Sequence, residues 1–158
     1  MRLIARRWLA LATTSMGLYL ALPDRGFAQN DEGPRITLGT LKGTYVGAFS
    51  GNIVDASGNL IAFTVAVRET YFGNGTASGV TTFVFQGQAV QSRVTFTGTY
   101  TVNADGSVLE TDTQSNGFVL HFEEYPTPDG DTIAGIQTDP GVLSYSVLTR
   151  GPLERREP

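Results

Sequence analysis

The polar side chains best placed to do chemistry lie on one predicted strand near residue 120. Val119, His121, Glu123 and Tyr125 occupy alternate positions there and alternate with three apolar residues, Phe118, Leu120 and Phe122. An imidazole, a carboxylate and a phenol on one face could together protonate, deprotonate or orient a substrate. That arrangement requires a bulge that turns the polar face inward. With regular alternation, the phenylalanine face is buried, and His121 and Glu123 lie in solvent.

A second kind of candidate is a carboxylate on the buried face of a strand. Glu69 lies in the same alternating phase as Val67, and Glu110 lies within a later strand. Burial against apolar side chains raises the pKa of a carboxyl group, which lets it hold or transfer a proton near neutral pH. We therefore name His121, Glu123 and Glu69 as candidate catalytic residues.

Several familiar active-site chemistries are disfavoured by the composition. The chain has no cysteine and one histidine, so neither a Ser-His-Asp or Cys-His arrangement nor a zinc site is expected. The acidic segments 103–106 and 129–131 lack the spacing of an EF-hand loop and are typical of hairpin turns. Residues 73–75 lie between two predicted strands, with no helix to hold a pyrophosphate. We expect no metal and no cofactor.

The elements that position these residues are short strands separated by turn chemistry. Glycine, asparagine and aspartate recur at seven breaks, where they supply the backbone conformations that tight hairpins need. No segment shows helical periodicity. The alternation between the breaks predicts eight strands, at residues 43–54, 60–72, 76–86, 88–102, 107–115, 118–125, 132–138 and 142–150.

The short connections predict how these strands pair. Neighbouring strands joined by tight turns form an antiparallel meander, and closing eight of them into a cylinder removes the exposed edges. The sequence therefore predicts an all-β fold, an eight-stranded antiparallel up-and-down β-barrel over residues 41–150. A two-layer sandwich is the alternative, but the absence of long crossovers argues against Greek-key connections.

The predicted interior is rich in aromatic rings. On strand 88–102 the threonines share one face, which must meet water, and the apolar residues share the other. A barrel of eight strands can either fill its lumen with side chains or hold one small ligand. Besides Phe49, the rings expected to face inward and contact a ligand are Tyr45, Phe63, Phe83, Phe85, Phe96, Tyr100, Phe118, Phe122 and Tyr145.

The first and last strands carry a further pattern. Gly43-Thr44-Tyr45 and Arg150 resemble the calycin superfamily (lipocalins, fatty-acid-binding proteins and avidins), in which a basic residue of the last strand covers a Gly-x-Trp on the first. The resemblance implies a ligand-binding barrel with Arg150 packed over Tyr45, which stands where the family has tryptophan. In architecture alone the chain is also similar to allene-oxide-cyclase-like and dirigent-like proteins, which act on reactive apolar molecules without a cofactor.

The net charge and the first residues of the sequence limit which partners and which cellular compartment are expected. Residues 1–28 have a basic start, a 15-residue apolar stretch and Gly26-Phe27-Ala28, typical of a cleaved signal peptide, and the stretch is short for a membrane anchor. The remaining 130 residues carry 7 basic and 14 acidic residues, a net charge of −7, which disfavours nucleic acid. We expect a secreted or periplasmic product starting near Gln29, with flexible segments at residues 29–40 and 151–158.

Three functions remain open, and the lumen distinguishes them. A lumen lined by apolar groups and tyrosines favours a carrier of a small apolar or aromatic molecule. A buried ionisable group favours a cofactor-free cyclase or isomerase, and a lumen without a void favours a filled structural or interaction barrel. The sequence does not fix the ligand or the oligomeric state.

Overall fold

The computed structural model describes residues 35–151. The predicted signal peptide, residues 1–28, lies outside this range, as do residues 29–34 and 152–158. Within residues 35–151, no helix has the length and apolar character needed to cross a membrane.

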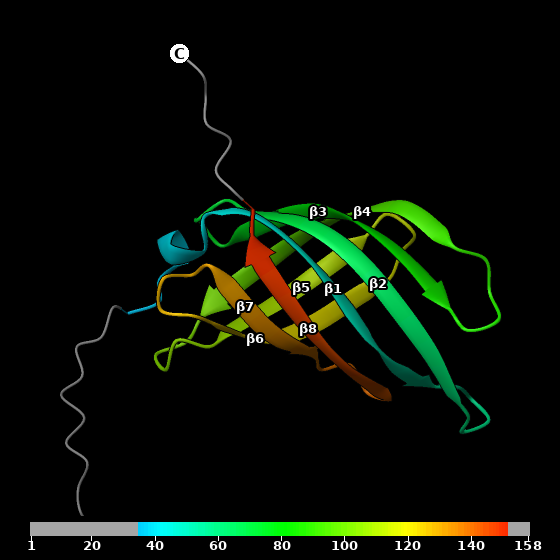
Figure 1. The fold of residues 1–158 in the computed structure, drawn as a ribbon. Coiled ribbons are helices and arrows are strands. Elements are labelled where there is room, and N and C mark those ends of the chain that lie inside the picture. Colours follow the sequence, from blue (N-terminus) through cyan, green and yellow to red (C-terminus); the bar gives the residue numbers. More distant parts are fainter. Residues whose placement is uncertain (1–34, 152–158) are drawn as a thin grey trace, which may run out of the picture. The chain divides into compact units, whose positions relative to one another are not determined.

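The described residues form a closed antiparallel barrel in which the strands pair in chain order and β8 closes on β1 (Figure 1). This confirms the predicted fold class, and the strand bounds lie within three residues of those predicted. The strands are β1 (Gly43–Val54), β2 (Leu60–Tyr71), β3 (Thr76–Phe85), β4 (Gln91–Val102), β5 (Val108–Gln114), β6 (Val119–Pro126), β7 (Thr132–Gln137) and β8 (Val142–Arg150).

One end of the barrel is plugged by a short 3-10 helix, η1 (Leu38–Leu41), drawn in cyan in Figure 1. It lies at the end of the segment predicted as a flexible lead-in. Thr37 caps it by accepting a hydrogen bond from the backbone N–H of Thr40. Leu41 is fully buried among the residues at the start of β1 and the end of β2, including Tyr45 and Tyr71. We call this the closed end.

The alternation of the two faces agrees with the prediction on most strands. On β4, the side chains of Val94, Phe96 and Tyr100 are buried, and the threonines between them are exposed.

The prediction for Tyr145 is wrong, because its side chain is 67% exposed on the outer face of β8. Tyr145 pairs with Ser50 on β1, whereas Ser146 pairs with the inward-facing Phe49. Since directly paired residues share a face, Ser146 and Leu148 point inward, and Tyr145 must point out.

Two glycines let β1 cross β8 closely enough to close the cylinder. A side chain at Gly51 would overlap the carbonyl oxygen of Leu143 and lie 2.7 Å from Cβ of Ser144. A side chain at Gly47 would likewise overlap the carbonyl oxygen of Val147. Glycine in a strand interior is typical of such close backbone approaches.

The closure at Gly51 can be tested by adding one methyl group. Gly51→Ala should lower the free energy of unfolding by about 2–3 kcal/mol, because β8 must move away from β1. Ser50→Ala, one position along on the exposed face, should change it by less than about 0.5 kcal/mol. Urea unfolding of both variants measures this, and an unchanged Gly51→Ala would contradict the close approach.

Candidate functional site

The lumen contains two adjacent cavities that share Phe49, Gln114 and Leu120 as a common boundary. The larger has a volume of about 380 Å³. It reaches the end of the barrel opposite η1, where the exposed side chains of Gln88 and Phe118 line it. The smaller has a volume of about 30 Å³ and lies among carboxylates. A space of this size holds one water molecule or one small cationic group.

The larger cavity, which we call the aromatic cavity, is lined mainly by aromatic and aliphatic side chains. Edge-to-face contacts hold its rings, with centroids 6.2 Å apart for Phe49 and Phe63 and 5.6 Å apart for Phe83 and Phe85. The structure therefore places Phe63, Phe83, Phe85 and Phe118 of the predicted ligand-contacting set around this cavity. Its remaining lining residues are Phe49, Ile53, Val65, Gln88, Gln114, Leu120, Gln137 and Val142.

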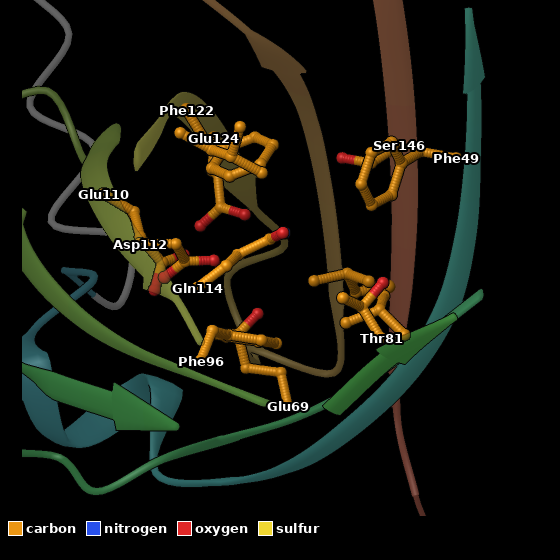
Figure 2. A pocket seen from close by; sticks show the side chains of 13 residues that line it. Phe49, Glu69, Thr81, Phe96, Glu110, Asp112, Gln114, Phe122, Glu124 and Ser146 are labelled. Carbon is orange, nitrogen blue, oxygen red and sulfur yellow. The ribbon is translucent and has the colours of Figure 1, made fainter. Parts of the chain in front are cut away.

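Below the aromatic cavity, four acidic side chains from three strands meet inside the barrel (Figure 2). They are Glu69 on β2, Glu110 and Asp112 on β5, and Glu124 on β6, each no more than 6% exposed. The inward alternation of their strands puts them there, since Glu69 continues the phase of Val65 and Val67. We call these four residues the carboxyl layer. Phe96 and Phe122, also predicted to contact a ligand, line the small cavity with them.

The carboxyl layer is only partly satisfied by hydrogen bonds. The hydroxyl of Tyr71 lies 2.7 Å from Oε2 of Glu110, to which it donates, and 3.1 Å from Oε2 of Glu124. Three buried oxygens have no hydrogen-bond partner among residues 35–151: Glu69 Oε1, Glu110 Oε1 and Asp112 Oδ1.

Gly98 on β4, which pairs with Asp112 on the neighbouring strand β5, leaves space for two of these oxygens. A side chain at Gly98 would lie 2.9 Å from Oε1 of Glu110 and would overlap Oδ1 of Asp112. The absence of a side chain on β4 therefore leaves the space into which β5 directs its carboxyl groups.

Within residues 35–151 no cationic side chain neutralises the carboxyl layer. The contacts there between a basic and an acidic side chain are His121 with Asp139 and Arg150 with Asp131, and both lie away from the layer. An ionised carboxylate removed from water without a partner is costly, so burial favours the protonated form.

Burial accordingly raises the pKa of every member of the layer. Loss of water is the largest cause for each, and the neighbouring carboxylates add to it. The pKa of Glu110 rises to about 8, that of Asp112 to about 8 and that of Glu124 to about 7. The pKa of Glu69 is raised well above its usual value. The layer thus holds several protons near neutral pH, and it is the part of the lumen able to exchange them.

The closed end consists of stacked tyrosines under one arginine. Tyr71 packs edge-to-face against Tyr45 and Tyr100, with ring centroids 5.4 and 5.0 Å apart. Nη2 of Arg150 donates to the hydroxyl of Tyr45 over 2.8 Å, and the guanidinium carbon lies 5.3 Å from the ring centroid. This confirms the expected packing of Arg150 over Tyr45. Tyr45 and Tyr100 line neither cavity but seal the lumen below the carboxyl layer.

His121 and Glu123 lie on the outer face of β6, because the strand alternates regularly and no bulge reverses it. Nδ1 of His121 is 2.7 Å from Oδ1 of Asp139, on the turn between β7 and β8. Glu123 accepts a hydrogen bond from the hydroxyl of Tyr125 over 2.7 Å. The structure therefore places His121 and Glu123 outside the lumen. Of the three catalytic candidates, Glu69 faces the lumen.

The sequence analysis missed Tyr71, Asp112 and Glu124. The signal was nonetheless present in the alternation. Glu124 continues the phase of Phe122, and Asp112 that of Glu110. The exposed trio of His121, Glu123 and Tyr125 drew the analysis to the opposite face of the same strand.

The geometry of the layer also allows it to hold a cation. One oxygen each from Glu69, Glu110 and Asp112 lies within 4.8 Å of the other two. Hard cations and ammonium groups both prefer such oxygen partners. The loop motifs in the sequence do not predict a cation site at Glu69, Glu110 and Asp112.

Comparison of the sequence with models of known protein families and with curated proteins found no match.

The raised pKa values predict how stability depends on pH. A carboxyl group with a raised pKa in the folded state stabilises the fold below its unfolded pKa, near 4, and loses this contribution as pH rises through the folded value. The free energy of unfolding should therefore fall by on the order of 2 kcal/mol or more between pH 5 and pH 9. Asp112→Asn should flatten this fall, since its amide does not ionise. Urea titrations across this range measure it, and a stability that rises toward pH 9 would contradict the burial of the layer.

Proposed function

We propose that the barrel binds a small apolar or aromatic molecule in the aromatic cavity. The observation that carries this proposal is a cavity of about 380 Å³, walled by phenylalanine, at the end of the lumen opposite η1. Ligand pockets are typically concave, mostly apolar and equipped with a few polar groups that orient the ligand. A barrel serving only as a structural module has no need of such a void, so the cavity favours a binding function.

The proposal extends to the protein's family and compartment. The closed eight-stranded barrel and the packing of Arg150 over Tyr45 are compatible with a relative of the calycins. The sequence of residues 1–28 supports export, with a mature chain that starts near Gln29 and is secreted or periplasmic.

The direct test is native mass spectrometry of the mature protein purified from its own host. The proposal predicts a discrete additional mass that unfolding releases as an apolar small molecule. A clean mass of the empty chain, together with no binding of a panel of apolar and aromatic compounds, would contradict it.

A tryptophan placed in the aromatic cavity would report its occupancy. The sequence has one tryptophan, Trp8, inside the predicted signal peptide, so the mature chain offers no background. Phe85→Trp should change its emission when an apolar ligand enters, because the indole loses contact with water. Phe72→Trp is the matched control, since Phe72 is 48% exposed outside the cavity. Equal responses from both variants would indicate nonspecific surface binding.

A second candidate function is a cofactor-free isomerase or cyclase, favoured by the position of the carboxyl layer directly below the aromatic cavity. In an isomerisation, one carboxylate removes a proton from a ligand carbon, and a protonated neighbour returns a proton to another carbon. The double bond moves between them, and no oxidant or reductant is needed. A proton held on a buried carboxyl group is suited to this role.

Solvent deuterium distinguishes an isomerase from a carrier. If the layer exchanges protons with carbon atoms of a bound compound, incubation in heavy water should add carbon-bound deuterium to the co-purified ligand. Mass spectrometry after back-exchange in ordinary water detects it. Glu69→Gln should abolish the incorporation, whereas His121→Ala should preserve it, because His121 lies outside the barrel. No incorporation by the native protein leaves the carrier as the better account.

A further inference from the structure

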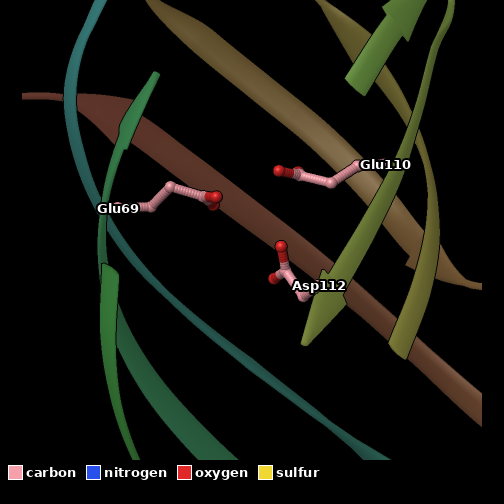
Figure 3. A group of neighbouring side chains, drawn as sticks. All are labelled: Glu69, Glu110 and Asp112. Carbon is pink, nitrogen blue, oxygen red and sulfur yellow. The ribbon is translucent and has the colours of Figure 1, made fainter. Parts of the chain in front are cut away.

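Glu69, Glu110 and Asp112 each bring one carboxyl oxygen within 4.8 Å of the other two, and each also has a buried oxygen without a hydrogen-bond partner. Figure 3 shows Glu69 extending from one side of the lumen, and Glu110 and Asp112 from the other. Glu69 and Glu110 are 4% and 3% exposed, and each directs an oxygen without a hydrogen-bond partner toward this space. Buried polar atoms are normally paired, so three orphaned acceptors around one void indicate a missing donor.

The missing donor must be small and must carry several N–H or O–H groups. A positive charge on it would also neutralise the carboxylates. All the orphans are carboxyl oxygens, and no cationic side chain of residues 35–151 pairs with the layer. Arg150 does not serve, because its guanidinium donates to Tyr45 and to the carbonyl oxygen of Gly130 at the closed end. Protons held by the layer can pair some of these oxygens with one another in the empty barrel, but a single donor to all three has to come from outside the described chain, and the aromatic cavity is the adjoining space.

We propose that the barrel binds a primary amine with an apolar body, its ammonium group held by Glu69, Glu110 and Asp112. This inference deepens the proposed binding function and rests on it. An alkylammonium group has three N–H donors and one carbon substituent. The three donors match the three unpartnered oxygens, and the substituent points away from them toward the aromatic cavity.

The distances fit an ammonium nitrogen. Three oxygens within 4.8 Å of one another all lie within about 2.8 Å of a common point, which is 4.8 Å divided by √3. A nitrogen near that point can make charge-assisted N–H···O bonds, about 2.7–2.9 Å long, to all three residues. The void of about 30 Å³ accommodates one such group.

The residues that line the two cavities fit the apolar body of the proposed amine. Phe49 and Leu120 line both cavities, so an apolar body leaving the carboxyl layer passes between them into the aromatic cavity. Phe96 and Phe122 line the small cavity beside the carboxylates, and aromatic rings near an ammonium group add a favourable cation–π interaction. Charge selects the head group, and the phenylalanines select the body.

Three compounds with one body and different heads test the inference: phenylbutylamine, phenylbutanol and phenylbutyrate. Calorimetric titration of the chain starting at Gln29 should show the amine binding at least about tenfold more tightly than the alcohol. The carboxylate should bind more weakly than both, because its negative charge is repelled by the carboxyl groups of the layer.

Substitutions then locate the preference. Glu110→Gln and Asp112→Asn keep the shape of each side chain and should each lower the amine's affinity by about tenfold while leaving the alcohol's nearly unchanged. Glu123→Gln is the matched control, because Glu123 lies on the outer face of β6. Gly98→Ala keeps all four acids but fills the space beside Glu110 and Asp112, and it should also reduce the preference for the amine.

The outcomes separate the two proposals. Equal binding of amine and alcohol would leave the apolar binding site standing and overturn the amine. Binding of none of the three would overturn the proposed function in this cavity and the amine with it. Tight binding of Ca²⁺ alone that Asp112→Asn abolishes, without a preference for the amine, would assign the three oxygens to a metal ion instead and overturn the inference.

Discussion

Four carboxyl groups lie inside the barrel, and among residues 35–151 no positively charged side chain pairs with them; this constrains everything else about the lumen. Carboxylates in a poorly hydrated interior cannot all be ionised without partners, so either protons or an imported cation must neutralise them. Tyr71 contributes one donor to Glu110 and sits close to Glu124, and Gly98 leaves the space the group occupies. Neither removes the need for a compensating charge. A layer of this kind lowers the stability of the empty barrel at neutral pH, which is typical of a site kept for function rather than for folding.

The lining of the lumen changes from one end of the barrel to the other, because each strand places different inward residues along its length. Tyrosines and Leu41 occupy the closed end, carboxyl groups the middle, and phenylalanines the other end. If the barrel binds a ligand as proposed, a molecule entering from the aromatic end passes apolar walls before its head group reaches the carboxyl layer. The aromatic cavity then holds its body, and the carboxyl layer selects its head group. The same order suits a carrier and an enzyme, since both need the ligand oriented against the carboxyl layer.

The fold was predictable because turn chemistry and alternation are local signals. The hairpin breaks lie where the glycines, asparagines and aspartates placed them, and short connections leave few topologies besides a meander. The orientation of β8 was not predictable in this way. Leu143, Tyr145 and Val147 form its more apolar face, yet they point outward, because pairing with β1 places Ser146 opposite the inward Phe49. The register of the neighbouring strand overrode the hydrophobic pattern of the strand itself.

Two of the four members of the carboxyl layer could be predicted from the sequence. Glu69 and Glu110 stood in inward phase on their own strands, but their convergence with Asp112 and Glu124 depends on strand tilt and stagger, which one-strand patterns do not encode. The volume of the cavities depends on the same quantities. The sequence therefore indicated buried acids and an aromatic lumen, and only the closed barrel brought them together as one site.

We infer that protons neutralise these buried carboxyl groups in the empty barrel. A pH titration of the side-chain carboxyl carbons by NMR measures this residue by residue. The account predicts that Glu110 and Asp112 titrate at about 8 and Glu124 at about 7, far from the exposed acids. Titration of all the carboxyl groups at their ordinary values, near 4, would show that the layer is hydrated or paired and would contradict the account.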